Sequence, residues 1–191
     1  MLTSQSTFIA AVALAFAQFH SMTQWKSQHL DEIILYGDIN CRRQIRRFRH
    51  QSVIKPCEID SKIYLRRAKI LIEMCETIEK GIFEPTDLNE MKSKIDEILK
   101  TFKALLISYC GQCYALCTDE SAFYVLNSED TNESGKLIEK SRGGCCAIRS
   151  TSLETVVEYL ASNFRVTKQR YEIYSFRIDK LIKIEEELEK V

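Results

Sequence analysis

Three short apolar runs in the middle of the chain limit its fold more than any other feature. They are Ala104–Tyr109, Tyr114–Cys117 and Ala122–Leu126. Turn-forming residues separate them, first Cys110-Gly111-Gln112 and then Thr118-Asp119-Glu120-Ser121. Short runs rich in aromatic and branched residues, divided by turns, predict the strands of an antiparallel meander. A fourth run, Cys145–Ile148, follows two glycines and predicts one more strand of this sheet.

An apolar helix is predicted at the start of the chain, over residues 5–20. A helix that is hydrophobic on all sides is typical of a protein core. The stretch Phe8–Ala17 also resembles a secretory signal, but no basic residue precedes it, so we favour the buried helix. The stretch is too short to span a bilayer.

The remaining elements follow from periodicity and turn residues. Gly37 is expected to end a helix over residues 28–36, and Asp38 to cap another over residues 39–49. Residues 53–59 are a loop or an edge strand, and residues 61–80 fit a strand or a helix, because short apolar runs do not distinguish the two. Helices over 87–102 and 151–163, a strand over 171–178 and a charged helix over 180–191 are also predicted.

These elements predict an α+β fold, with N-terminal helices packed on a mostly antiparallel sheet of about 4–6 strands. The 191 residues suit one domain. We expect it to cover residues 1–165, with the strand and charged helix of residues 166–191 packed on or extending it. Basic and acidic residues number 27 each, so the net charge of zero gives no bulk attraction to nucleic acid or membranes.

Five arginines lie in the segment Arg42–Arg49. Such a cluster can contact phosphates, but only Phe48 among them offers a stacking ring, so a solvated basic helix face is favoured. The histidines are His20, His29 and His50, all outside the predicted sheet. The sequence therefore shows no evident pair of nucleophile and histidine base.

The eight cysteines lie mostly within apolar runs, which favours reduced, buried thiols over a disulfide framework. Cys110 and Cys113 have CxxC spacing. Zinc would require a second ligand pair at comparable spacing, and a redox pair should open a helix. Cys113 instead opens a strand, so a hairpin turn is favoured and no metal or cofactor is expected.

Several segments carry a resemblance when taken in order. They are Ser4-Gln5-Ser6 at the head of the apolar helix, Trp25, Leu30–Asp38, Phe123–Glu129, Gly144–Arg149 and Ser152–Leu160. Over about residues 1–164 this order resembles the papain-like cysteine peptidase domain of herpesvirus large tegument proteins, a deubiquitinase type with relatives in transposon-encoded and insect proteins. The resemblance implies a papain-like fold, with a nucleophilic cysteine after a glutamine and an Asp-x-His element at a strand end.

The chain departs from that pattern at the positions of the nucleophile, the base and the orienting residue. Ser6 stands where the resemblance places the nucleophile, Glu129 where it places the histidine, and Asn127 where it places the orienting aspartate. Gln5, the expected oxyanion donor, is kept. A serine hydroxyl without a base is a poor nucleophile. A glutamate with an ordinary pKa of about 4.3 is a mismatched base for it.

The resemblance therefore implies a catalytically inactive pseudo-deubiquitinase that acts as a protein-binding module. Its expected partner is ubiquitin or a ubiquitin-like protein, inside the cell in the cytoplasm or nucleus, with no membrane. The binding residues implied are Gln5, Ser6, Asn127, Ser128 and Glu129. Two alternatives stay open: a hydrolase with a rewired site on Ser6 or a cysteine such as Cys145, and a nucleic-acid contact through Arg42–Arg49.

Overall fold

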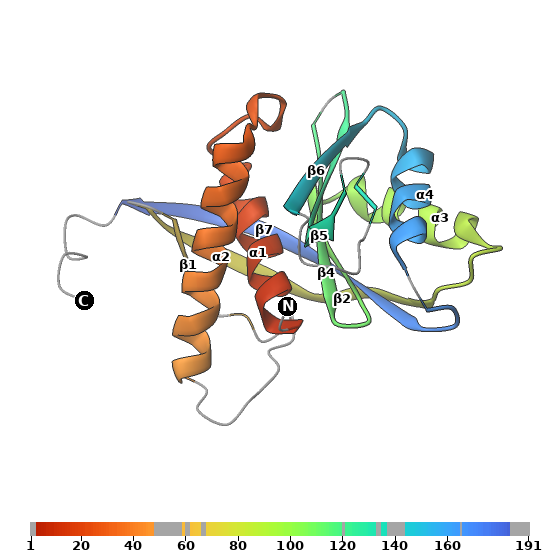
Figure 1. The fold of residues 1–191 in the computed structure, drawn as a ribbon, viewed down its shortest axis with the longest axis horizontal. Helices are drawn as coiled ribbons and strands as arrows, with labels where there is room; N and C mark the ends of the chain where they lie inside the picture. Colours follow the sequence, from red (N-terminus) through yellow and green to blue (C-terminus); the bar gives the residue numbers. More distant parts are fainter. Residues whose placement is uncertain are drawn as a thin grey trace.

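The computed structural model describes residues 3–47, 59, 62–65, 68–119, 121–132, 135–136, 144–164 and 166–183. Its centre is one antiparallel sheet of seven strands in the order β1-β2-β7-β3-β4-β5-β6 (Figure 1). The strands are β1 Lys62–Leu65, β2 Ala68–Ile82, β3 Ala104–Tyr109, β4 Gln112–Thr118, β5 Phe123–Thr131, β6 Gly144–Ser150 and β7 Arg170–Lys183. The predicted meander and the strand after it are thus confirmed.

The hairpin between β3 and β4 turns on two residues. Cys110 and Gly111 both have positive φ, 48° and 80°, as a tight two-residue hairpin of type I′ requires. Glycine adopts this conformation without strain, and the turn matches the twist of the flanking strands. The hairpin interpretation of the CxxC spacing is therefore confirmed.

Two expectations from sequence concern the other half of the sheet. Residues 61–80 fitted a strand or a helix, and their described part forms two paired strands, with β1 against the start of β2 and β2 extending to Ile82. The predicted strand over 171–178 extends to Lys183, so the expected helix was wrong for residues 180–183, while residues 184–191 lie outside the described part. Strand β7 lies between β2 and β3, and so joins the two halves of the sheet.

Helices cover both faces of the sheet. Helices α1 (Thr3–Phe16) and α2 (Ser27–Arg47) lie on one face, and α3 (Leu88–Leu99) and α4 (Leu153–Asn163) on the other (Figure 1). A short 3-10 helix, η1 (Met22–Gln24), precedes α2. Alternate residues of a strand point to opposite faces. In β3, Leu106 accordingly packs in the α1 cluster, whereas Leu105 and Ile107 pack in the cluster of α3 and α4.

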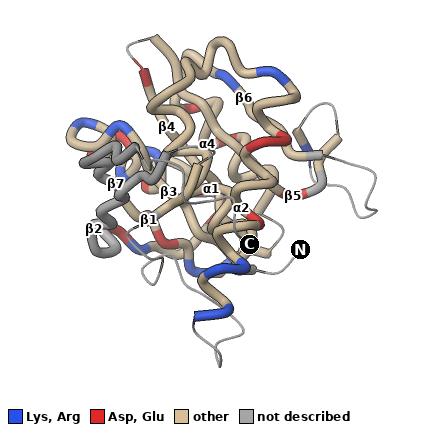
Figure 2. Tube along the Cα trace, turned by 90° about the vertical axis from the view of Figure 1, so that its left-hand side faces the viewer, with Lys and Arg blue, Asp and Glu red and all other residues tan. Residues whose placement is uncertain are grey.

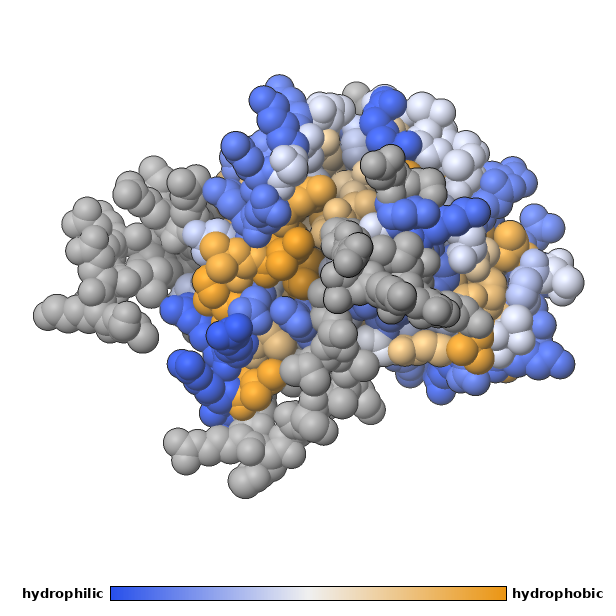
Figure 3. All heavy atoms as spheres, viewed as in Figure 1, coloured by the Kyte–Doolittle hydropathy of each residue, from blue (hydrophilic) through white to orange (hydrophobic). Residues whose placement is uncertain are grey.

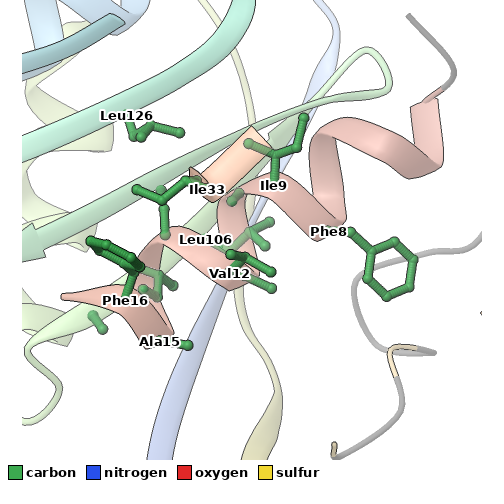
Figure 4. Close-up of a cluster of buried hydrophobic side chains, with 14 of the residues drawn as sticks. Phe8, Ile9, Val12, Ala15, Phe16, Ile33, Leu106 and Leu126 are labelled. Atoms are coloured by element: carbon green, nitrogen blue, oxygen red, sulfur yellow. The ribbon is translucent and has the colours of Figure 1, made fainter. Parts of the chain in front are cut away.

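Helix α1 is the core of its layer. Every residue from Phe8 to Phe16 is at most 2% exposed. Figure 2 shows no Lys, Arg, Asp or Glu along it, and Figure 4 shows Ile9, Val12 and Phe16 beside Ile33 of α2 and Leu126 of β5. The apolar stretch is thus a core helix, as favoured above, although it ends at Phe16 instead of near residue 20.

The prediction that Gly37 ends a helix was wrong. Helix α2 runs without interruption from Ser27 to Arg47, and Gly37 is buried within it. A Cβ atom at Gly37 would lie 2.5 Å from Ile9 Cγ1 and 2.8 Å from Ile9 Cα. The glycine is present because α1 and α2 cross there at very short range, a tertiary contact that the local sequence does not reveal.

The two helices on the other face agree with their predictions within a few residues. Helix α3 buries Met91, Ile95 and Ile98, and helix α4 buries Leu153, Val156, Val157 and Leu160. Both stripes follow the spacing of three and four residues that defines one helix face. Residues 53–58 of the predicted loop or edge strand lie outside the described part of the chain.

Candidate functional site

The first turn of α1 points at the β3–β4 hairpin. Ser6, the fourth residue of α1, is 1% exposed, and its hydroxyl donates a hydrogen bond to the Gly111 carbonyl at 3.4 Å. The next residue, Thr7, places its hydroxyl 3.1 Å from the Cys113 thiol. The candidate nucleophile is therefore enclosed between helix and hairpin, with its proton directed at a backbone oxygen.

Cys113 is the common neighbour of the candidate residues. Burial raises the pKa of its thiol from 9.0 to about 11, although hydrogen bonds with Thr7, Ser108 and Ser6 act in the opposite direction. The charge of Glu129 raises it further. Ser6 and Glu129 thus both lie in the surroundings of one neutral thiol, and we call Ser6, Thr7, Ser108, Cys113 and Glu129 the Cys113 cluster.

Asn127 lies at the end of the regular β5–β6 pairing and faces the other helix layer. It is 0% exposed, and its amide nitrogen donates to the Tyr159 hydroxyl of α4 at 3.3 Å. Its amide oxygen accepts the Glu129 N–H at 3.0 Å. The pairing of β5 with β6 is irregular beyond Asn127, so this side chain fixes the backbone that carries Glu129.

Ser128 lies between these two residues and is 3% exposed. Its hydroxyl has no hydrogen-bond partner among the described residues. Ser6, Asn127 and Ser128 are thus buried, whereas Gln5 and Glu129 are half-buried and so reach the surface.

Gln5 is engaged with α2. Its amide nitrogen lies 3.4 Å from Asp38 Oδ1, and Asp38 also pairs with the Arg42 guanidinium at 2.8 Å. Asp38 was expected to cap a helix, yet it lies inside α2 and fixes the glutamine instead. The Gln5 amide is thus in contact with α2.

The described histidines lie at the opposite end of α1. The His20 and His29 rings stack with centroids 5.5 Å apart, and His20 also stacks on Phe16 at 4.4 Å. Phe16 is ten residues after Ser6, or about 15 Å along the helix. His50 lies outside the described residues. No described histidine is therefore placed to act on Ser6.

The other chemical candidates are engaged elsewhere. Six cysteines are described and all are free thiols; burial raises the pKa of Cys145 to about 12. In the basic cluster, Arg42 pairs with Asp38 and Arg43 stacks over the Tyr64 ring at 4.3 Å. Across the described segments, no three His, Cys, Asp or Glu side chains gather as metal ligands. None of the described helices has the length and hydropathy of a membrane span.

The first turn of α1 meets the β3–β4 hairpin within an α+β fold, and comparison with known proteins places this architecture in a family. The family described as "Herpesvirus tegument protein, N-terminal conserved region" matches residues 2–182. The chain belongs to this family. The match includes β7, beyond the stretch of about 164 residues that carried the resemblance in sequence.

One solved structure with the same fold is the ubiquitin-specific protease encoded by the murine cytomegalovirus tegument protein M48, in complex with a ubiquitin-based suicide substrate. The TM-score is 0.72 at 12% sequence identity, over 97% of this chain and 81% of that chain. The expected papain-like α+β fold is thereby confirmed, although the sheet has seven strands where about 4–6 were expected, because residues 62–82 supply two of them. No curated protein matches the chain.

Sequence reasoning missed the residues that surround the candidates. Cys113 was considered only as part of a CxxC spacing, and Asp38 only as a helix cap. For Tyr159, the sequence predicted only that the residue lies in a helix. Each acquires its role through a contact between residues far apart in the chain, such as the 106 residues that separate Thr7 from Cys113.

Proposed function

We propose that this chain is a catalytically inactive cysteine-peptidase-like domain that binds another protein inside the cell, in the cytoplasm or nucleus. The observation that carries the proposal is the buried Ser6 hydroxyl, which donates to Gly111 while the described histidines lie at the far end of α1. A serine nucleophile requires a base that accepts its proton. Here the Ser6 hydroxyl contacts a peptide carbonyl at 3.4 Å, and a peptide carbonyl is not such a base.

The cysteines near the site support the same proposal. The attacking species of a cysteine enzyme is the thiolate. Burial raises the pKa of Cys113 to about 11 and that of Cys145 to about 12, so both are protonated thiols at neutral pH. Glu129, half-buried beside Cys113, disfavours the thiolate further through its own negative charge. In a hydrolase that used Cys113 or Cys145 as nucleophile, the surroundings would disfavour the thiolate that has to attack the substrate.

Ubiquitin or a ubiquitin-like protein is the partner that we propose. The M48 protease, which shares this fold, is known in complex with a ubiquitin-based suicide substrate. A domain can retain a docking surface after the catalytic residues change, because docking depends on the shape and charge of the surface. Helix α1, the β3–β4 hairpin and β5 surround Ser6 and Glu129 in this chain.

Two measurements test the two parts of the proposal. A ubiquitin-based suicide probe should not label the wild-type domain, and an NMR titration with ubiquitin should shift a defined set of its amide signals. Labelling that disappears in Ser6→Ala or Cys145→Ala would refute inactivity. Ser162→Ala, an exposed change on α4, serves as the control for nonspecific loss of labelling. Unchanged signals at high ubiquitin concentration would refute the ubiquitin partner.

A further inference from the structure

Leu35 is a large apolar residue on the solvent-facing side of α2. The helix buries Ile33, Gly37, Asn40, Cys41 and Gln44. At 3.6 residues per turn, Leu35 is about 200° from Ile33 around the axis and points away from the core. Its exposed fraction is 55%. Packing within the described domain therefore gives no reason for leucine at this position.

The residues around Leu35 form a shallow depression of about 370 Å³. It is lined by Gln5, Asp31, Ile34, Leu35, Asp38 and Arg42. Ile34 is half-buried and continues the apolar surface of Leu35 toward the core. Figure 3 shows an apolar patch bordered by hydrophilic residues where α2 lies on this face. We call Asp31, Ile34, Leu35, Asp38 and Arg42 the α2 stripe.

The charges of the α2 stripe select among partners. Asp31 and Asp38 contribute two carboxylates and Arg42 contributes one guanidinium, so the stripe carries one net negative charge. Asp38 is held in place by Gln5 on one side and Arg42 on the other, whereas Asp31 is exposed. An apolar anchor beside carboxylates is complementary to an apolar patch bordered by Lys or Arg.

The α2 stripe also adjoins the candidate site. Gln5 lines the depression and directly precedes Ser6 in the first turn of α1. A partner seated on Leu35 would therefore lie beside the start of α1 and the hairpin that faces it. The stripe therefore adjoins Ser6 through its chain neighbour Gln5.

We propose that the α2 stripe is the surface on which a ubiquitin-like protein docks, through an apolar patch bordered by basic side chains. Leu35 and Ile34 are the anchors, and Asp31 and Asp38 are the charged rim. This inference rests on the proposed function, and it names the surface through which that function is carried out. Buried apolar anchors dominate binding free energy, whereas rim charges mainly affect association rate and salt dependence.

The test measures ubiquitin binding to the full chain by isothermal titration, with Leu35→Asp as the main variant. We expect binding at least about tenfold weaker, because a charge replaces the central anchor. Ile82→Asp is the matched control: Ile82 is 60% exposed and lies at the end of β2 remote from β1. It should bind within about twofold of wild type, as expected outside a hot spot.

A second pair of variants tests the charge argument. Asp31→Lys should weaken ubiquitin binding at low salt, with a smaller difference from wild type at high salt because salt screens exposed charges. Glu97→Lys, an exposed charge reversal on α3, should leave the affinity unchanged. If wild type binds ubiquitin and Leu35→Asp binds equally well, the α2 stripe is refuted while the proposed function stands. If wild type does not bind, the ubiquitin partner itself is refuted.

Discussion

Replacing Gly37 with alanine tests the crossing of α1 and α2. The added Cβ would lie 2.5 Å from Ile9 Cγ1, 2.8 Å from Ile9 Cα and 3.0 Å from Ile9 N. Two of these three atoms belong to the backbone, so a change of rotamer at Ile9 cannot relieve the overlap. The helices must move apart, although α1 is buried on all sides.

The expected cost combines two opposing effects. Overpacking a core costs up to about 3 kcal/mol, and the backbone contacts place this site at the upper end. Alanine in a helix interior is favoured over glycine by about 1 kcal/mol. The net loss in free energy of unfolding should be about 2 kcal/mol. For a domain of this size, that lowers the melting temperature by about 4–8 °C.

Thermal unfolding followed by circular dichroism measures the effect. Ser93→Ala, at an exposed position of α3, is the control, because it improves helix propensity without a steric contact and should leave the melting temperature equal or slightly higher. A second test is the double variant Gly37→Ala with Ile9→Ala. Removing the Ile9 side chain should not rescue stability, because the backbone overlap remains. A Gly37→Ala domain as stable as wild type would refute the close crossing.

Two further predictions concern polar contacts. Tyr159→Phe removes the hydroxyl that accepts a hydrogen bond from the fully buried Asn127 amide. We expect a loss of about 1–3 kcal/mol in the free energy of unfolding, measured by urea denaturation. An unchanged free energy would contradict the contact. Hydrogen bonds from the Ser121 N–H and the Tyr124 hydroxyl hold the pKa of Asp119 at about 2, below its ordinary 3.8. Because the pKa of Asp119 is lower in the folded than in the unfolded state, its stabilisation is present above pH 3.8 and is lost as the pH falls toward 2. Asp119→Ala should therefore lower the melting temperature at pH 6 but not at pH 2. A difference that did not change with pH would contradict this assignment.

The elements that could be predicted from sequence are those set by local patterns. The meander followed from apolar runs divided by turns, and helices α3 and α4 followed from one-sided periodicity. The apolar content of α1 sufficed to predict a core helix. Each of these signals lies within a window of about 15 residues, the range over which propensity and amphipathic pattern act.

The interpretation of Gly37 shows where this reasoning fails. Glycine after an apolar helical stretch is a frequent C-terminal signal, so the sequence predicted two helices. The structure has one continuous helix, and position 37 is glycine because Ile9 of α1 approaches too closely for a side chain there. The same applies to Asp38, which resembled a helix cap and instead holds Gln5 and Arg42.

By itself, the sequence determined the class of the fold and which residues stand at the positions that the family resemblance singles out, since composition and order along the chain are local facts. Only the tertiary structure placed β7 between β2 and β3, brought Ser6 to Gly111 and Cys113, and left Leu35 facing outward. These outcomes depend on which distant segments pair and pack. That choice is made by the free energy of the whole core, and no single stretch of the chain encodes it.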